Sequence, residues 1–445
     1  MNFQSLIVLE VALATSAAFS QDLAPEVLML ARIKAHMRHE LAQIPNFTCV
    51  ETLERYHKAS GPASIMKPLD TLQLEVAHIA GRELFSWLGD RNFKEDNPAM
   101  FIGGGMIGSG AFASHLRSLF LGDALFQYRG EVDLGGRPAA CYSFQISARA
   151  SGYQILVAGG AGTVGVKGLF WADPQSLDLI RMQLHADEIP PTLPLVDAIT
   201  TIDYARMRIG AADVLMPQTG EMHLIQFSGE EDRNTVEFTH CRSFNTDSNI
   251  SFTAANAPTP VTSSAQPVPT RTALETVPGG LLVSLVLTTP ITDQAPIGQM
   301  IEAKVSGSVQ YKNQVLVPDG SVVRGRVRRL ERNSQPESHF IVAVEFNEIQ
   351  AGASLLRFYA DLQNIDGPPE VERFLSYSSV SSHTSGVRGI SPDSGHQYDS
   401  VHSEVTNKEV RLVDLPGIGS FFVRGTHFSL PTGLKMTWKT RALAH

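Results

Sequence analysis

Apolar residues recur at helical spacing near the N-terminus and then alternate with polar residues along most of the chain. Within 25–43 they stand three or four residues apart, at Leu30, Ile33, Met37 and Leu41. This spacing predicts one amphipathic helix. From about 47 to 252, short alternating runs are separated by Gly, Pro, Asn and Asp, which predicts antiparallel strands. A helical insert is expected at 110–120, so 21–253 is predicted to be an α+β domain.

A proline-rich segment then divides the chain. Residues 254–275 contain four prolines together with Ser, Thr and Ala, a composition typical of an extended linker. Alternating runs resume in 276–445 and predict an all-β domain, either a barrel or a sandwich. Inside this second domain, 376–403 is rich in Ser and Gly and has few apolar residues. We expect a mobile loop there.

The first twenty residues resemble an export signal. Residues 3–19 are mostly apolar, and Ala18-Phe19-Ser20 has the small-x-small pattern that signal peptidase cleaves. Residues 1–20 are therefore predicted to be a signal peptide, removed after Ser20, which makes the protein periplasmic or secreted. Glu10 lies inside the apolar stretch and no Lys or Arg precedes it, so a short membrane anchor or a misassigned start codon stays open.

Length, charge and hydropathy narrow the class of protein. The chain has 445 residues, 43% of them hydrophobic, and a net charge of −9. The length favours more than one domain. The acidic balance disfavours nucleic acid as a partner. No run of about 18 apolar residues follows residue 21, so no transmembrane helix is expected after the signal peptide.

The three cysteines, Cys49, Cys141 and Cys241, are too far apart for a CxxC metal or redox motif. In an oxidising compartment any one pair of them would leave a free thiol. We prefer Cys49 with Cys241, because both lie near the ends of the first domain and a long closed loop gains most in the chain-entropy model. Three buried, reduced thiols remain the alternative.

No motif in the sequence indicates catalysis. Glycines match G-x-G-x-x-G at 103–108 and at 160–165, but neither match lies in the strand-turn-helix setting that binds a dinucleotide. The histidines show no metal-ligand spacing, and neither a G-x-S-x-G elbow nor a phosphate-binding loop occurs. We therefore expect no catalytic residue, no cofactor and no metal.

A basic run in the second domain is the one candidate for a binding surface from charge alone. Arg324, Arg326 and Arg328 alternate along a predicted strand and should form one cationic stripe. The stripe is either a solvated outer face or a docking surface for an acidic partner.

One segment of the first domain resembles a known family. Gly168-Leu169-Phe170-Trp171-Ala172-Asp173-Pro174, followed by 177–184, is similar to the strand, W-x-D-P turn and strand of LolA-like lipoprotein-carrier and sorting domains. The resemblance implies a helix and a curved antiparallel half-barrel whose apolar concavity accepts acyl chains. It would place Phe170 and Leu179 on the ligand-facing side.

Other segments resemble two further groups of proteins. The runs 44–56 and 238–244 are similar to uncharacterised secreted families of soil bacteria such as acidobacteria. In the second domain, 298–305 and 315–325 resemble the barrel of TrbI-like type IV secretion channel proteins, with a tight turn at Pro318-Asp319-Gly320-Ser321. The latter resemblance implies a small β-barrel, whereas the upstream membrane helix of those proteins has no counterpart here.

These observations lead to one main hypothesis and two others. The main one is an exported, non-enzymatic cell-envelope protein that binds an apolar ligand, such as a lipid or a lipoprotein acyl chain, or an envelope protein partner. The second is a purely structural scaffold of an envelope or secretion complex. The third is a hydrolase with dispersed site residues. A concave face filled by the protein's own side chains would argue against the ligand.

Overall fold

A computed structural model describes residues 23–90, 93, 97–102, 105–110, 113–157, 160–244, 275–333, 338–373, 403–408 and 417–442. The predicted signal peptide, nearly all of the 254–275 linker and all but the last residue of the 376–403 loop lie outside these residues. The described part is mostly antiparallel β-structure with few helices, and the longest helix is N-terminal. This confirms the predicted fold class of a helix with β-rich domains.

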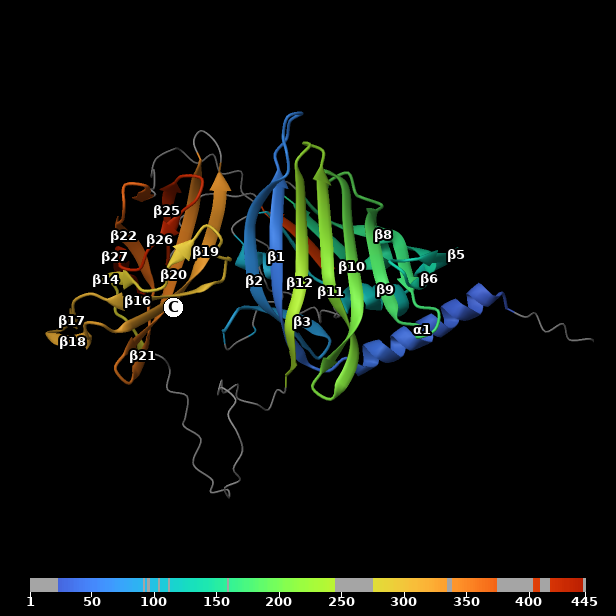
Figure 1. Cartoon of the computed structure of the whole chain (residues 1–445), viewed down its shortest axis with the longest axis horizontal. Helices are drawn as coiled ribbons and strands as arrows, with labels where there is room; N and C mark the ends of the chain where they lie inside the picture. The colour runs from blue at the N-terminus through green and yellow to red at the C-terminus, as the bar shows by residue number, and fades with distance from the viewer. Residues whose placement is uncertain are drawn as a thin grey trace, which may run out of the picture.

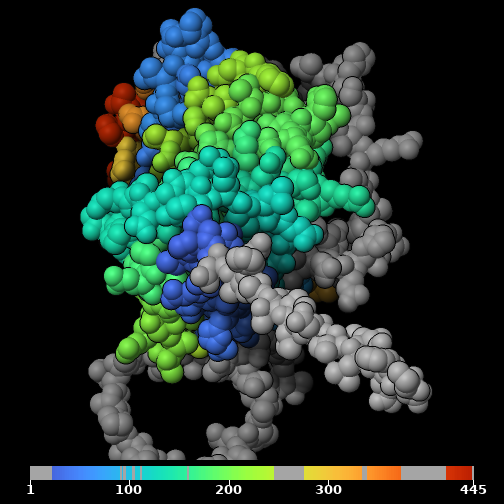
Figure 2. Space-filling model, turned by 90° about the vertical axis from the view of Figure 1, so that its right-hand side faces the viewer, coloured from blue at the N-terminus to red at the C-terminus, as the bar shows by residue number. Residues whose placement is uncertain are grey.

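The N-terminal helix α1 (Pro25–Gln43) forms where the spacing predicted it. It buries Ile33, Met37 and Leu41, and the hydroxyl of Tyr142 donates a hydrogen bond to the carbonyl of Glu26 near its start. Figure 2 shows α1 in blue against teal residues from the middle of the first domain. The apolar stripe of the helix therefore closes one side of the first sheet.

The first sheet has thirteen strands: β1 (Phe47–Lys58), β2 (Lys67–Ile79), β3 (Arg82–Trp87), β4 (Gly105–Gly108), β5 (Leu125–Asp133), β6 (Pro138–Ile146), β7 (Tyr153–Val157), β8 (Gly160–Ala172), β9 (Leu179–Asp187), β10 (Leu195–Ile209), β11 (Ala212–Gln226), β12 (Glu231–Ser243) and β24 (Ser403–Lys408). Its main path runs β3-β2-β1-β12-β11-β10-β9-β8-β7-β24-β4, and β6 and β5 branch from β8. The long central strands stand side by side in Figure 1. Between Ala198 and Tyr204, buried positions of β10 alternate with partly exposed ones, which gives this sheet an inner and an outer face.

Three short helices accompany α1: η1 (Pro98–Phe101), α2 (Ser114–Phe120) and α3 (Ala148–Ser151). Of these, α2 shares the inner core with α1. The expected helical insert at 110–120 corresponds to α2, which begins at Ser114; residues 111 and 112 lie outside the described residues. Leu116, Leu119 and Phe120 of α2 join the core that α1 and strands β6 to β11 form. The curved sheet is therefore packed on its inside by helices of its own chain.

The second sheet has ten strands: β13 (Glu275–Thr276), β14 (Leu282–Leu287), β16 (Met300–Val305), β19 (Val322–Asn333), β20 (His339–Ala351), β21 (Ser354–Arg357), β22 (Ala360–Asp366), β23 (Val371–Arg373), β25 (Ile418–Arg424) and β27 (Lys435–Thr440). Two separate two-stranded pairs accompany it: β15 (Ile291–Thr292) pairs with the distant β26 (Ser429–Leu430), and β17 (Val309–Tyr311) forms a hairpin with β18 (Gln314–Val317). The sheet curls because β25 pairs with β20 and also contacts β22 at the other end of the path. Its core is centred on Trp438, whose ring meets that of Phe346 edge-on at 5.5 Å.

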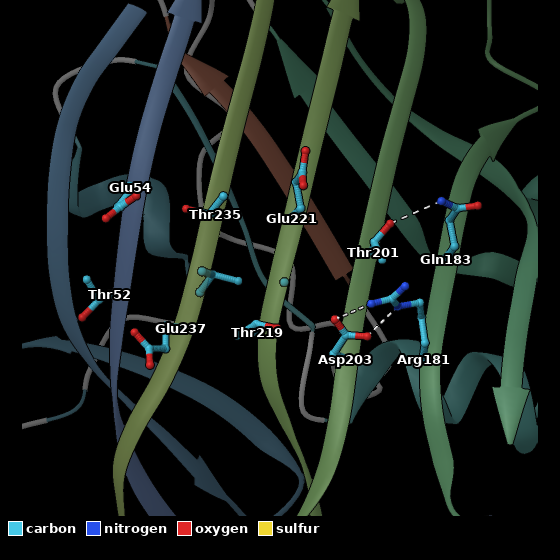
Figure 3. Close-up of a pocket in the computed structure, with 12 residues that line it drawn as sticks. Thr52, Glu54, Arg181, Gln183, Thr201, Asp203, Thr219, Glu221, Thr235 and Glu237 are labelled. Atoms are coloured by element: carbon cyan, nitrogen blue, oxygen red, sulfur yellow. Dashed lines mark hydrogen bonds and ion pairs between the residues drawn. The ribbon is translucent and has the colours of Figure 1, made fainter. Parts of the chain in front are cut away.

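One strand crosses the predicted domain boundary. β24 follows the second domain's strand β23 in sequence, yet it pairs in parallel with β7 and antiparallel with β4 in the first sheet. The boundary at 254–275 stays a prediction, but residues beyond 276 do not all belong to the second sheet. Figure 3 shows this strand behind the central strands of the first sheet.

The two sheets also meet directly. The backbone of Ile297 pairs with that of Leu72, and its amide donates to the carbonyl of Thr71 at 2.6 Å. Gly298 beside it has a φ of +95°, and a Cβ there would lie 2.5 Å from the Gln73 carbonyl oxygen. Only glycine fits this conformation and this close approach. One apolar core runs through β1, β2 and the second sheet, so the halves are joined by packing as well as by the chain.

Candidate functional site

The predicted ligand-facing residues lie inside the packed core. Phe170 is 0% exposed and Leu179 is 1% exposed. Three rings surround Phe170, with centroids 5.2 to 6.0 Å away: those of Phe120 on α2, Phe126 on β5 and Tyr142 on β6. The position where the resemblance places a ligand is thus filled by α2 and the neighbouring strands.

A small cavity remains in the interior of the first domain. It measures about 30 Å³ and lies between apolar side chains and the polar residues Glu51, Glu83, His115 and Thr200. This volume holds about one water molecule. An acyl chain is far too large for it in the conformation that the structure describes.

Two titratable groups at this cavity are shifted by burial. Burial, with the Glu83 carboxylate as a lesser cause, raises the pKa of Glu51 to about 8. Burial lowers the pKa of His115 to about 4, and a hydrogen bond with the Ser109 backbone opposes that shift only in part. Both side chains are therefore uncharged near neutral pH, as the apolar walls require.

The outer face of the same sheet is polar and hollowed (Figure 3). One hollow of about 630 Å³ crosses β1, β12, β11, β10 and β9, and its outward-facing lining residues are Thr52, Glu54, Arg181, Gln183, Thr201, Asp203, Thr219, Glu221, Thr235 and Glu237. Strand register places each carboxylate directly beside a threonine, as with Glu54 and Thr235 or Asp203 and Thr219. Carboxylates and hydroxyls therefore alternate across the surface.

Cations neutralise only part of this charge. The Arg181 guanidinium donates to both carboxylate oxygens of Asp203, at 2.6 and 2.9 Å. Glu54 accepts a hydrogen bond from the Tyr56 hydroxyl at 3.0 Å. Among the described residues, Glu221 and Glu237 have no ion-pair partner. The hollow is therefore net acidic.

A second hollow continues the first. It measures about 610 Å³ and lies over β5, β6, β8 and β9. Gln183 lines both hollows. Lys167 in the second pairs with Asp187 at 3.1 Å, while Arg129 donates to the Ser143 hydroxyl at 2.9 Å. This end carries more positive than negative side chains, so the charge changes sign along the outer face.

The arginines of the predicted stripe mostly contact other residues of the same chain. Arg326 is 4% exposed and donates to Asp90 of the first domain at 2.7 Å. The guanidinium groups of Arg326 and Arg328 lie 5.4 and 4.9 Å from the centre of a Trp87 ring, a cation–π geometry. Arg324 alone lies away from this joint and pairs with Glu302 at 3.4 Å. Arg326 is thus inaccessible to another molecule.

The cysteines and glycine motifs take structural positions. Cys49 on β1 and Cys241 on β12 form a disulfide, and Cys141 is a buried free thiol whose pKa is raised by burial. Glycines 160, 162 and 165 lie within strand β8, with no helix after them. In the described part of the chain, no cluster of three or more His, Cys, Asp or Glu side chains is placed to hold a metal ion. No helix there is long and apolar enough to cross a bilayer.

Sequence reasoning missed the outer hollow, although its signal was present. Threonine alternates with glutamate in Thr52-x-Glu54, Thr219-x-Glu221 and Thr235-x-Glu237, and this pattern recurs on three strands. Only the register shows that these pairs stand side by side.

Comparison with known proteins gives one weak structural likeness. No family model matches the chain, and no curated protein matches it. Among solved structures, it is similar to a putative outer membrane lipoprotein-sorting protein domain from Vibrio parahaemolyticus, with 12% identity over 50% of this chain and 93% of that one. The TM-score of 0.26 is too low to establish a common fold. The resemblances to TrbI-like channels and to acidobacterial families find no counterpart and stay predictions.

Proposed function

We propose that this protein is a non-enzymatic binding protein of the bacterial cell envelope, exported by its N-terminal segment, which engages a protein partner on the outer face of its first sheet. The observation that carries the proposal is the contrast between a filled interior and a hollowed exterior. The interior holds a cavity of about 30 Å³, whereas the outer face has hollows of about 630 and 610 Å³ that meet at Gln183.

Packing energy supports an interior that stays closed. Opening a path to Phe170 would expose side chains of α2, β5 and β6 that are now in contact. Each large apolar side chain returned to water costs about 1.5–3 kcal/mol. A lipid would have to replace all of those contacts before binding gave any net gain.

The chemistry of the outer face supports binding rather than catalysis. Apart from Gly220 and Val236, the first hollow is lined by threonine, glutamine, carboxylates and one arginine, and among its described lining residues there is no histidine, cysteine or serine. Its openness to water also screens charge, whereas catalytic pairs depend on dry, preorganised sites. The lining suits hydrogen bonding to a polar partner.

A lipid or lipoprotein ligand is the second candidate, and a surface feature favours it. Val27 and Leu28 at the start of α1 are about half exposed, and Leu125 on β5 is 72% exposed. Val27 and Leu28 lie shortly after the predicted signal peptide, Leu125 lies at the start of β5, and all three side chains lie outside the packed core. An acyl chain or membrane surface would bind there without opening the interior.

Site-specific photo-crosslinking tests the main proposal. A photoreactive residue at Thr201, at the centre of the first hollow, should give one discrete crosslinked protein in the native cells. The matched control is the same residue at Lys304, exposed on the second sheet. Equal or absent crosslinking from both positions would contradict the proposal. Crosslinking from Leu125 to lipid alone would favour the second candidate.

A further inference from the structure

The outer face of the first sheet forms one continuous surface across eight strands. Directly paired residues cross it in a single row: Glu54, Thr235, Glu221, Thr201, Gln183, Leu169, Ser143 and Gln127. Neighbouring strands are about 4.8 Å apart, so this row is roughly 34 Å long. The two hollows lie along it and share Gln183, so a single elongated molecule can occupy both.

The net charge of the side chains changes from negative at the β1 end of this row to positive at the β5 end. At the β1 end, the carboxylates of Glu54, Glu221 and Glu237 are free of ion pairs with described residues, and only Asp203 is neutralised, by Arg181. At the β5 end, Lys167 and Arg129 outnumber Asp187. A surface of this kind repels an anionic membrane or a nucleic acid at its larger, acidic end.

The spacing of the acidic end fits an extended polypeptide. Glu54, Glu237 and Glu221 lie on adjacent strands as diagonal neighbours in the register, which places their Cβ atoms about 7–8 Å apart. Residues i and i+2 of an extended chain are separated by roughly 6.6 Å. Alternate basic side chains of one extended segment therefore meet successive carboxylates, while the intervening threonine hydroxyls offer hydrogen bonds to its backbone.

From this geometry, and resting on the proposed function, we infer that the outer face binds an extended segment of a partner polypeptide whose basic end lies over β1, β12 and β11 and whose acidic end lies over β5 and β6. A segment of roughly ten residues spans the row. The exposed Leu125 at the β5 end adds a contact for an apolar side chain. Complementary charge fixes the direction in which the segment lies.

The test uses two short fluorescein-labelled peptides of identical composition. In the first, alternating lysine and threonine are followed by alternating glutamate and threonine; in the second, the lysines and glutamates are interleaved. Fluorescence polarisation with the full mature chain should show tighter binding of the first peptide, weakening as salt is raised. Equal binding of both peptides would overturn the inference, as would tighter binding of the second.

Variants locate the binding. The triple variant Glu54→Gln, Glu221→Gln, Glu237→Gln should weaken binding of the first peptide roughly tenfold, since each exposed pair contributes modestly. Arg129→Gln should weaken it roughly twofold. The matched control replaces three exposed acids in the second half of the chain and should leave binding unchanged: Glu275→Gln, Asp366→Asn and Glu370→Gln. An unchanged affinity in the first triple variant would overturn the inference.

Crosslinking separates this inference from the proposed function. If the peptides fail to bind but Thr201 still crosslinks to one protein, the outer face is a partner site and the charge complementarity is wrong. If neither the peptides nor a crosslinked protein is found, the proposed function fails as well. If the first peptide binds but the triple variant does not weaken its binding, the peptide binds to another part of the protein. That result contradicts the inference and leaves the proposed function untouched.

Discussion

The two faces of the first sheet are built by the same strands and have opposite character. Along β10, Ile202 and Tyr204 face inward and are buried, while Thr201 and Asp203 face outward into the first hollow. The inner face is closed by α1 and α2, whereas no described element covers the outward residues of the hollow. The chain's own helices thus fill the space on one face of these strands, while the other face is hollowed and polar.

The largest effect should follow truncation on the inner face. Phe170→Ala removes a fully buried ring from between three others and should lower the free energy of unfolding by about 3–5 kcal/mol. Urea denaturation measures it. Leu169→Ala, the adjacent residue on the outer face, is the control and should cost less than about 1.5 kcal/mol. A small effect of Phe170→Ala would show that the interior is loosely packed and open to a ligand.

The pH dependence of the free energy of unfolding tests whether Glu51 is shielded from water in the interior. Its pKa is about 8 when folded and 4.5 as a free side chain, so stability falls as pH rises from 4.5 to 8, where the unfolded chain has released the proton and the folded chain keeps it. Glu51→Gln should remove this loss and raise the free energy of unfolding by about 3 kcal/mol at pH 7.

The control for Glu51 is Glu54→Gln, three residues along β1 and facing outward. His115, with its pKa lowered to about 4, acts in the opposite window, because stability falls as pH drops from 6.5 towards 4. Above pH 6.5 the contribution of His115 no longer changes, but His57, whose pKa is raised by its hydrogen bond with Asp232, still titrates. The difference between the wild-type and Glu51→Gln unfolding curves therefore isolates Glu51. A wild-type stability that stays flat between pH 6.5 and 8.5 would mean that Glu51 is hydrated and the interior is open.

The joint between the sheets should give a smaller effect. Asp90→Asn leaves the buried Arg326 guanidinium without its carboxylate and should lower the free energy of unfolding by about 1–3 kcal/mol. Glu302→Gln, which breaks the exposed pair with Arg324, is the control and should change it by less than about 1 kcal/mol. Equal effects would mean that the joint does not bury Arg326 in solution.

The outer face should contribute least to stability. The triple variant Glu54→Gln, Glu221→Gln, Glu237→Gln should change the free energy of unfolding by no more than about 0.5 kcal/mol per site, because surface substitutions away from buried networks are close to neutral. Thermal unfolding measures this. A large loss of stability would make these side chains part of the fold and remove the contrast between the faces.

Sequence periodicity was sufficient for α1, the alternating strands and the β-rich second half, because those features follow from local spacing. Periodicity alone could not predict that the interior of the first domain is closed. Whether Phe170 meets a ligand or Phe120 depends on where α2 packs. The stripe of Arg324, Arg326 and Arg328 was found from alternation alone, but its partner Asp90 is 236 residues away from Arg326. Such pairings depend on tertiary placement.

The central claim is that the interior of the first domain is closed. Its most direct test is mass spectrometry of the mature chain, purified from a bacterial periplasm without detergent. Native and solvent-extracted spectra are recorded from the same sample. We predict the mass of the protein alone, with no stoichiometric lipid in the extract. A phospholipid or acyl species bound at one copy per chain, and lost on Phe170→Ala, would contradict the account and restore the interior as the binding site.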